Sequence, residues 1–223
     1  MVSLPRMSPD KRPQPWWRHP AAVLAAAFFA GAVPFSNLMA RRRRCDDLRT
    51  IGSGTVSGTS LYNVAGFGAL ALAGVCDVAK GSVGPLLAGR DRPGLQAAAC
   101  GAAVAGHNWS PFLGGAGGRG ISPAIGALAT TAPAGAVALL GGMTVGRLAG
   151  ETALGSLAAN ALLVPLLART DGERGRLAGA VVVVVMMVKR VAGNAPAPPG
   201  RRWRTYVNRV VFDRDQTAKA ADS

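Results

Sequence analysis

Long apolar stretches, separated by short segments that carry most of the charge, run through almost the whole chain. Only 16% of its 223 residues are charged, whereas 49% are hydrophobic. A soluble domain of this length usually carries about 25% charged residues. A bilayer admits only spanning structures that satisfy their own backbone hydrogen bonds, so apolar stretches of this length are expected to be helices. The sequence therefore predicts an all-α fold, a polytopic integral membrane helical bundle of about five to seven membrane elements.

Charged turns and prolines divide the chain into expected spans. These spans cover residues 20–40, 61–78, 94–113, 124–142, 143–168 and 177–188. A further apolar piece at 82–88 is too short to cross alone and is expected to be a re-entrant or broken helix. The expected organisation has three parts: a basic N-terminal segment (1–19), a membrane domain (20–192), and a Pro-rich linker with a basic tail (193–223).

Basic residues are concentrated in the short loops and the tails, and the formal net charge is +14. The positive-inside rule and attraction to anionic lipid headgroups both lead to such a distribution. Arg41–Arg44, directly after the first span, predicts that this end of the span faces the cytoplasm. The basic tail, which includes Arg209, is expected to contact lipid headgroups. Aromatic residues make up only 5% of the chain and do not alternate with basic ones, so nucleic acid is not an expected partner.

The cysteines exclude several kinds of site. Cys45, Cys76 and Cys100 lack the spacing of metal ligands or of a disulfide framework, so we expect small buried side chains, no metal ion and no cofactor. The sequence also contains no Gly-x-Ser-x-Gly, Walker-type or His-Glu-x-x-His motif. These absences argue against hydrolases with a nucleophile elbow, P-loop enzymes and zinc peptidases.

One stretch, from Gly106 to Pro123, places a histidine and an amide directly before a glycine-rich loop. Glycines allow backbone N–H groups to converge on an anion, and Arg119 adds a fixed positive charge to the loop. The loop is therefore either a phosphate site at the end of an apolar segment or a flexible linker. His107 is either a structural side chain or a general base or phosphate donor.

Two further pairs of charges lie within apolar runs. Asp77 and Lys80 are three residues apart, so they share one face of a helix. They form either a structural ion pair or a site in which Asp77 holds Lys80 toward an anionic ligand. Arg147 and Glu151 are four residues apart and are expected to pair inside the bundle, with a role in substrate binding as the alternative.

Taken in order, these segments resemble the motifs of the integral-membrane, acyl-phosphate-dependent glycerol-3-phosphate acyltransferases (the PlsY family). Residues 51–63 resemble the motif Gly-Ser-Gly-Asn-x-Gly-Ala-Thr-Asn-x-x-Arg. Residues 77–81, with Pro85, resemble Asp-x-x-Lys-Gly-x-x-Pro. Residues 106–120 resemble Gly-His-x-x-Pro-x-Phe-Leu-x-x-x-Gly-Gly-Lys-Gly, with Arg119 at the lysine position. The resemblance covers about residues 20–215.

The chain departs from these motifs at several positions. Asn63 stands where the first motif has arginine. A last motif, His-Arg-x-Asn-Ile-x-Arg-Leu-x-x-Gly-x-Glu, is only faintly echoed at residues 203–215, with Trp203 and Tyr206 at its histidine and asparagine positions. These departures leave open a catalytically altered or inactive relative that binds anionic lipid or phosphate, and a small membrane transporter is a further alternative.

The resemblance implies an enzyme that moves a fatty acyl group from acyl phosphate to the hydroxyl of glycerol 3-phosphate, giving lysophosphatidic acid in the first step of phospholipid synthesis. It implies a multi-pass protein of the cell inner membrane, with the motif loops facing the cytoplasm and no assigned oligomeric state. The catalytic residues it implies are His107, Asn108, Lys80 and Ser53. The residues it implies for binding substrate phosphate are Gly52, Gly54, Thr59, Asn63, Asp77, Gly81, Gly117, Gly118, Arg119 and Gly120.

Overall fold

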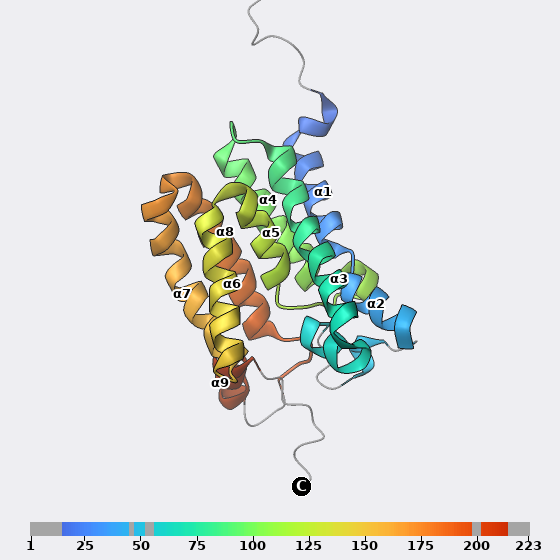
Figure 1. Cartoon of the computed structure of the whole chain (residues 1–223). Coiled ribbons are helices and arrows are strands. Elements are labelled where there is room, and N and C mark those ends of the chain that lie inside the picture. Colours follow the sequence, from blue (N-terminus) through green and yellow to red (C-terminus); the bar gives the residue numbers. More distant parts are fainter. Residues whose placement is uncertain (1–14, 45–46, 52–55, 198–201, 214–223) are drawn as a thin grey trace, which may run out of the picture.

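The computed structural model describes residues 15–44, 47–51, 56–197 and 202–213 of the chain. All regular elements in these ranges are helices, which confirms the all-α prediction (Figure 1). The α-helices are α1 (Pro20–Ala32), α2 (Phe35–Arg44), α3 (Gly58–Ala88), α4 (Pro93–Asn108), α5 (Ile121–Thr131), α6 (Pro133–Leu148), α7 (Thr152–Thr170), α8 (Gly172–Ala192) and α9 (Arg202–Phe212). Short 3-10 helices accompany them at η2 (Trp16–Arg18), η3 (Leu48–Thr50) and η4 (Pro111–Leu113).

Within the described ranges, three helical segments are long and apolar enough to cross a membrane: Pro20–Arg43, Gly58–Ala88 and Thr152–Thr170. The first of these combines α1 and α2, which are separated by a break at residues 33–34. Pro34 cannot donate a backbone hydrogen bond, so the helical ladder stops there. The second, α3, is kinked at Gly66, whose φ of 77° suits glycine and is costly for other residues.

A proline divides one expected span into two helices. Residues 124–142 belong to both α5 and α6, because α5 ends at Thr131 and α6 begins at Pro133. Proline fits the first turn of a helix, where no backbone donor is needed, and it disfavours the helical conformation at the preceding residue. Ala132 is accordingly non-helical, with φ −151° and ψ 79°. The expectation of a single span here is therefore wrong.

Two other expected segments also have different boundaries. Residues 143–168 are divided by a turn at 149–151, so Arg147 lies in the last turn of α6 and Glu151 directly precedes α7. The four-residue spacing suggests that the two side chains share one helix, but the turn separates them. The short piece at 82–88 is the last part of α3 rather than a re-entrant segment.

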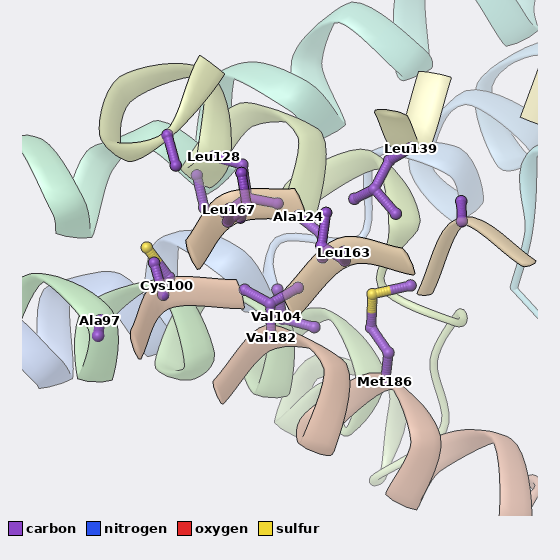
Figure 2. Packing of buried hydrophobic residues seen from close by; sticks show 14 residues of the cluster. Ala97, Cys100, Val104, Ala124, Leu128, Leu139, Leu163, Leu167, Val182 and Met186 are labelled. Atoms are coloured by element: carbon purple, nitrogen blue, oxygen red, sulfur yellow. The ribbon is translucent and has the colours of Figure 1, made fainter. Parts of the chain in front are cut away.

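The main apolar core lies among α4, α5, α7 and α8, with a contribution from α6 (Figure 2). Val104, Leu128 and Leu163, from three of these helices, are each 0% exposed in this core. Cys100 is buried beside them, as expected for a small apolar side chain, whereas Cys76 of α3 is only partly buried and Cys45 lies outside the described residues. Lipid tails are as apolar as these residues, so their contribution inside a membrane comes chiefly from close packing.

Glycines bring pairs of helices into backbone contact. A Cβ at Gly106 of α4 would overlap the carbonyl oxygen of Phe28 in α1, and one at Gly126 of α5 would overlap that of Val78 in α3. Close approach through small residues is the usual packing device of membrane helices. Helices α1, α3, α4 and α5 are therefore held close together.

The two ends of the bundle differ. α2, α9 and the start of α3 lie at one end, which is the lower end in Figure 1. Because α4 returns along α3 to this end, the glycine-rich loop after α4 also lies there. At the opposite end, Arg18 forms an ion pair with Asp91 at 3.1 Å, and Arg92 donates to the carbonyl oxygen of Arg18.

The helix contacts predict opposite effects for two glycine substitutions. Gly126→Ala forces a Cβ against the carbonyl oxygen of Val78, and we expect the detergent-purified variant to lose about 1–3 kcal/mol of stability. Gly74→Ala is the matched control, because no atom lies within 4 Å of its Cβ position. We expect this control to be neutral or stabilised by about 0.5–1 kcal/mol. Thermal melting measures both, and equal shifts would contradict the α3–α5 contact.

Candidate active site

A cavity lies where the break between α1 and α2 faces the glycine-rich loop. Its lining residues are Ala32, Pro34, Phe35, Ser36, Val56, Asp77, His107, Ser110, Leu113, Gly117 and Gly118. Val56 belongs to the first motif-like segment, Asp77 to the second and His107 to the third. Three segments that are far apart in the sequence therefore meet around one space.

The loop after α4 is folded tightly on itself. Gly114, Gly115 and Gly120 have φ values of 65°, 86° and 80°, a region that residues with a side chain rarely adopt. Four amides within residues 114–118 donate to carbonyl oxygens within residues 107–113. These four amides therefore close the turns of the loop instead of converging on a ligand, which differs from the expected phosphate cradle.

His107 lies at the end of α4 with its ring against the loop. A Cβ at Gly118 would overlap Nε2 of His107, so glycine at this position leaves room for the imidazole. The ring lines the cavity and makes no hydrogen bond to another residue in the described part of the chain. Its nitrogens are therefore available to a ligand in the cavity.

Asn108 lies beneath the loop rather than in the cavity. Its side chain is 0% exposed, and Nδ2 donates to the carbonyl oxygen of Val185 in α8 at 3.4 Å. A Cβ at Gly120 would lie 2.7 Å from Oδ1 of Asn108. The amide thus connects α4 to α8, while its buried Oδ1 lies against Gly120 without a hydrogen-bond partner in the described part of the chain.

Asp77 and Lys80 form the predicted ion pair, with 2.7 Å between Lys80 Nζ and Asp77 Oδ1. Both side chains are buried, with exposed fractions of 6% and 4%. Lys80 also donates to the carbonyl oxygen of Val33 at 2.5 Å, and Ser36 donates to Asp77 Oδ2 at 3.2 Å. The pair therefore fastens the break between α1 and α2 to α3, and Asp77 lines the cavity whereas Lys80 does not.

Arg119 points from the loop toward the C-terminal part of the chain. Its Nε lies 2.7 Å from Oδ1 of Asp213, and Nη1 donates to the carbonyl oxygen of Lys189 at 3.2 Å. Only 10% of the Arg119 side chain is exposed. The loop cation therefore already has a carboxylate partner, and it does not line the cavity.

Two residues near the loop were missed by the sequence analysis. Lys189 is 1% exposed, lies 5.3 Å from the ring centre of Trp109, and donates to Oδ1 of Asn194 at 2.7 Å. Asn194 in turn donates to the carbonyl oxygen of Gly117 at 3.1 Å. A lysine at the end of the apolar run of α8 is a signal that could have singled out Lys189, because intramembrane charges mark functional sites.

The C-terminal helix α9 does not bring the expected tail residues to the cavity. Trp203 and Tyr206 are exposed on α9, and neither lines the cavity. Arg209 is 2% exposed and donates to the carbonyl oxygens of Val191, Ala192 and Ala195. The expectation that Arg209 contacts lipid headgroups is therefore wrong, because this side chain caps the end of α8.

The remaining expected site residues lie apart from the cavity or outside the described residues. Thr59 and Asn63 are exposed on the first turns of α3 and do not line it. Gly81 is buried, and a Cβ there would overlap the carbonyl oxygen of Pro123, so its close neighbour is α5. Gly52, Ser53 and Gly54 lie outside the described residues. Within the described ranges, no group of three or more His, Cys, Asp or Glu side chains is placed to hold a metal ion.

Known proteins resemble the chain over most of its length. A family model described as "Glycerol-3-phosphate acyltransferase" matches residues 21–196. The glycerol-3-phosphate acyltransferase of Anaeromyxobacter dehalogenans is 33% identical over 177 residues, which are 75% of this chain and 87% of that protein. That of Halalkalibacterium halodurans is 33% identical over 67% of this chain and 77% of the relative. For the Shouchella clausii enzyme, the match is 36% identical and spans 55% of that protein.

The fold also matches that of solved structures. The glycerol 3-phosphate form of PlsY (YgiH), an integral membrane glycerol 3-phosphate acyltransferase, has a TM-score of 0.70 at 21% identity. This match covers 88% of the present chain and 94% of the solved one, which supports an integral membrane helical bundle. The family match ends at residue 196, before the faint echo of the last motif at 203–215. The chain belongs to the glycerol-3-phosphate acyltransferase family.

Proposed function

We propose that this membrane acyltransferase moves a fatty acyl group from acyl phosphate to the hydroxyl of glycerol 3-phosphate, giving lysophosphatidic acid and phosphate. The observation that carries the proposal is the meeting of Val56, Asp77 and His107 around one cavity, since each comes from a different motif-like segment. The relatives named for this activity support it, as do the glycerol 3-phosphate and lysophosphatidic acid forms of the solved PlsY.

The chemistry needs few reactive groups. Acyl phosphate is an activated mixed anhydride, so the substrate hydroxyl attacks its carbonyl carbon while the bond from that carbon to the phosphate oxygen breaks. Phosphate leaves with the electron pair, and the hydroxyl proton needs an acceptor. The protein therefore acts through positioning, proton transfer and charge stabilisation, and no covalent enzyme intermediate is required.

His107 is the proton acceptor in this proposal. Its ring lines the cavity against Gly118, and the cavity volume of about 10 Å³ admits one group of the size of a water or a hydroxyl. Asn108 holds the end of α4 against α8, and the Asp77–Lys80 pair holds the α1–α2 break against α3, so both fix the walls around the substrates. The cavity end faces the cytoplasm, in keeping with Arg41–Arg44 and with a water-soluble acceptor.

Acyl transfer by the detergent-purified protein is the direct test. Acyl phosphate and glycerol 3-phosphate are supplied together, and phosphate release and lysophosphatidic acid are followed in the same reaction. We expect the two products in equal amounts. Phosphate without lysophosphatidic acid would indicate another acceptor or simple hydrolysis. Neither product, from protein shown to be folded, would indicate a relative that binds phosphate or anionic lipid without turnover.

Removing the proposed base should slow the chemical step. We expect His107→Ala to lower kcat by about 100-fold or more, because a positioned general base contributes about that much. The KM values for both substrates should change little. His19→Ala is the control, since this exposed histidine precedes α1 at the opposite end of the bundle. A kcat for His107→Ala equal to that of the control would exclude the base role.

Because the Asp77–Lys80 pair is buried, removing either side chain alone should destabilise the protein more than removing both. Lys80→Met leaves the Asp77 carboxylate buried without its partner, and we expect a loss of about 3–5 kcal/mol of stability. Adding Asp77→Asn should restore part of the melting temperature. The exposed Arg18–Asp91 pair is the control, and Asp91→Asn should cost about 0–1 kcal/mol. Equal losses at the two pairs would contradict the role of burial.

The double variant Lys80→Met with Asp77→Asn also separates two roles of Lys80. If Lys80 acts on the substrates, the refolded double variant remains inactive in acyl transfer. Recovery of transfer along with the melting temperature would restrict Lys80 to holding α1 and α2 against α3.

A further inference from the structure

Among the residues that the structure describes, no lysine or arginine side chain lines the cavity. Both substrates of the proposed reaction carry phosphate groups, which are multiply charged near neutral pH. Lys80 is paired with Asp77, and Arg119 is paired with Asp213. Four amides of the glycine-rich loop are also occupied by backbone carbonyl oxygens. Recognition of a substrate phosphate therefore calls for a further positive group beside the cavity.

A groove of about 300 Å³ lies next to the cavity and contains two arginines, Arg41 and Arg49. It shares Pro34 and Leu113 with the cavity, so the two spaces adjoin at the start of the glycine-rich loop. Asn63, which stands at the arginine position of the first motif, lines neither space. The groove therefore places arginine beside the cavity from a different part of the chain.

The backbone of Arg49 is fixed on several sides. Its neighbour Leu48 is 0% exposed and packs in a cluster with Leu61 and Leu113. The amide of Leu48 donates to Oδ1 of Asn37 in α2 at 2.8 Å. The amide of Arg49 donates to the Asp47 side chain at 3.0 Å. These contacts hold η3 against α2, α3 and the glycine-rich loop, so Arg49 has a defined position in the fold.

The guanidinium of Arg49 is directed at the glycine-rich loop. Nε and Nη2 contact the two carboxylate oxygens of Asp47 at 3.0 Å and 2.7 Å, and Nη1 donates to the carbonyl oxygen of Leu113 at 3.2 Å. The hydrogen bond from Arg49 lowers the pKa of the Asp47 carboxyl to about 2, so the pair stays charged at neutral pH. A guanidinium has five N–H donors, and these three contacts leave one on each terminal nitrogen.

The local charge is suited to an anion even though Asp47 is present. Arg41 lines the same groove and acts electrostatically on Asp47, so among the described residues these two arginines and Asp47 together carry a net charge of +1. The planar fork of arginine matches the oxygens of a phosphate group. Because η3 lies in the connection between α2 and α3, outside the apolar helices, a water-soluble phosphate can approach Arg49 from the end of the bundle.

We infer that Arg49, oriented by Asp47, binds the phosphate of glycerol 3-phosphate in this groove and supplies the cation that position 63 lacks. The inference rests on the proposed function, because it assigns the acceptor substrate of that reaction to this groove. The hydroxyl end of the acceptor then extends past Leu113 into the cavity, toward His107.

Binding of glycerol 3-phosphate tests the inference without turnover. The detergent-purified full chain is titrated calorimetrically with glycerol 3-phosphate in the absence of acyl phosphate. We expect Arg49→Ala to weaken binding at least tenfold. Arg43→Ala, an exposed arginine of α2 that lines neither space, should bind as the unmodified protein does. Unchanged affinity in Arg49→Ala would overturn the inference.

A conservative variant and a compensating variant distinguish a specific loss of binding from a general loss of folding. Arg49→Lys keeps the charge but loses the planar fork, so its affinity should fall between those of the unmodified protein and Arg49→Ala. Adding Asn63→Arg to Arg49→Ala should recover affinity, because it returns arginine to the motif position. Melting temperatures confirm that the variants are folded. A folded double variant that binds no better than Arg49→Ala would refute the exchange of roles between the two positions.

A second ligand distinguishes the two sources of phosphate. Dodecyl phosphate is a stable single-chain phosphate that resembles acyl phosphate, and its affinity should be nearly the same in Arg49→Ala. A loss confined to dodecyl phosphate would assign the groove to the acyl donor and overturn the inference. If glycerol 3-phosphate binds through Arg49 but the protein transfers no acyl group, the proposed function fails while the assignment of Arg49 stands.

Discussion

The buried contact between Asp77 and Lys80 is the interaction on which the shape of the site depends. Two charges removed from water are expensive, and in apolar surroundings they are retained only when each is paired and hydrogen-bonded. Here Lys80 reaches the carbonyl oxygen of Val33, and Asp77 accepts from Ser36, so one ion pair holds both sides of the break between α1 and α2. Without that break, α1 and α2 would continue as one helix and the cavity would lose the wall formed by residues 34–36.

Lys80 and Arg119, the cations that the motifs contribute, are each paired with a carboxylate. Asp77 neutralises Lys80 from the preceding turn of α3, whereas Asp213 reaches Arg119 from the end of α9. Such pairing offsets the desolvation cost of each cation in an apolar bundle. It also leaves each cation fewer donors and less charge for binding a substrate. Beside the cavity, Arg49 from the connection between α2 and α3 is also paired, with Asp47, but it is partly exposed to water and shares its groove with Arg41 of α2.

Much of the fold could be predicted from the sequence because its signals are local. Apolar length predicts membrane helices, and the three-residue spacing of Asp77 and Lys80 predicts their contact. Pro133 also marks the start of α6 in the sequence. A single span is nevertheless expected at 124–142, because the residues on both sides of this proline are apolar. The contacts of Lys189, Asn194 and Arg209 depend instead on how α8, α9 and the loop are placed in space. The spacing of residues carries no information about such placement.

The hydrogen bond from Asn194 to Gly117 and the ion pair of Asp213 with Arg119 have a consequence for biosynthesis. A ribosome delivers the glycine-rich loop long before it delivers α9, and the earlier helices enter the bilayer in the meantime. During that interval the loop lacks two of its contacts and Arg119 has no access to its carboxylate. The turns of the loop can therefore close from its own backbone hydrogen bonds, whereas Arg119 gains its carboxylate only after α9 has been made.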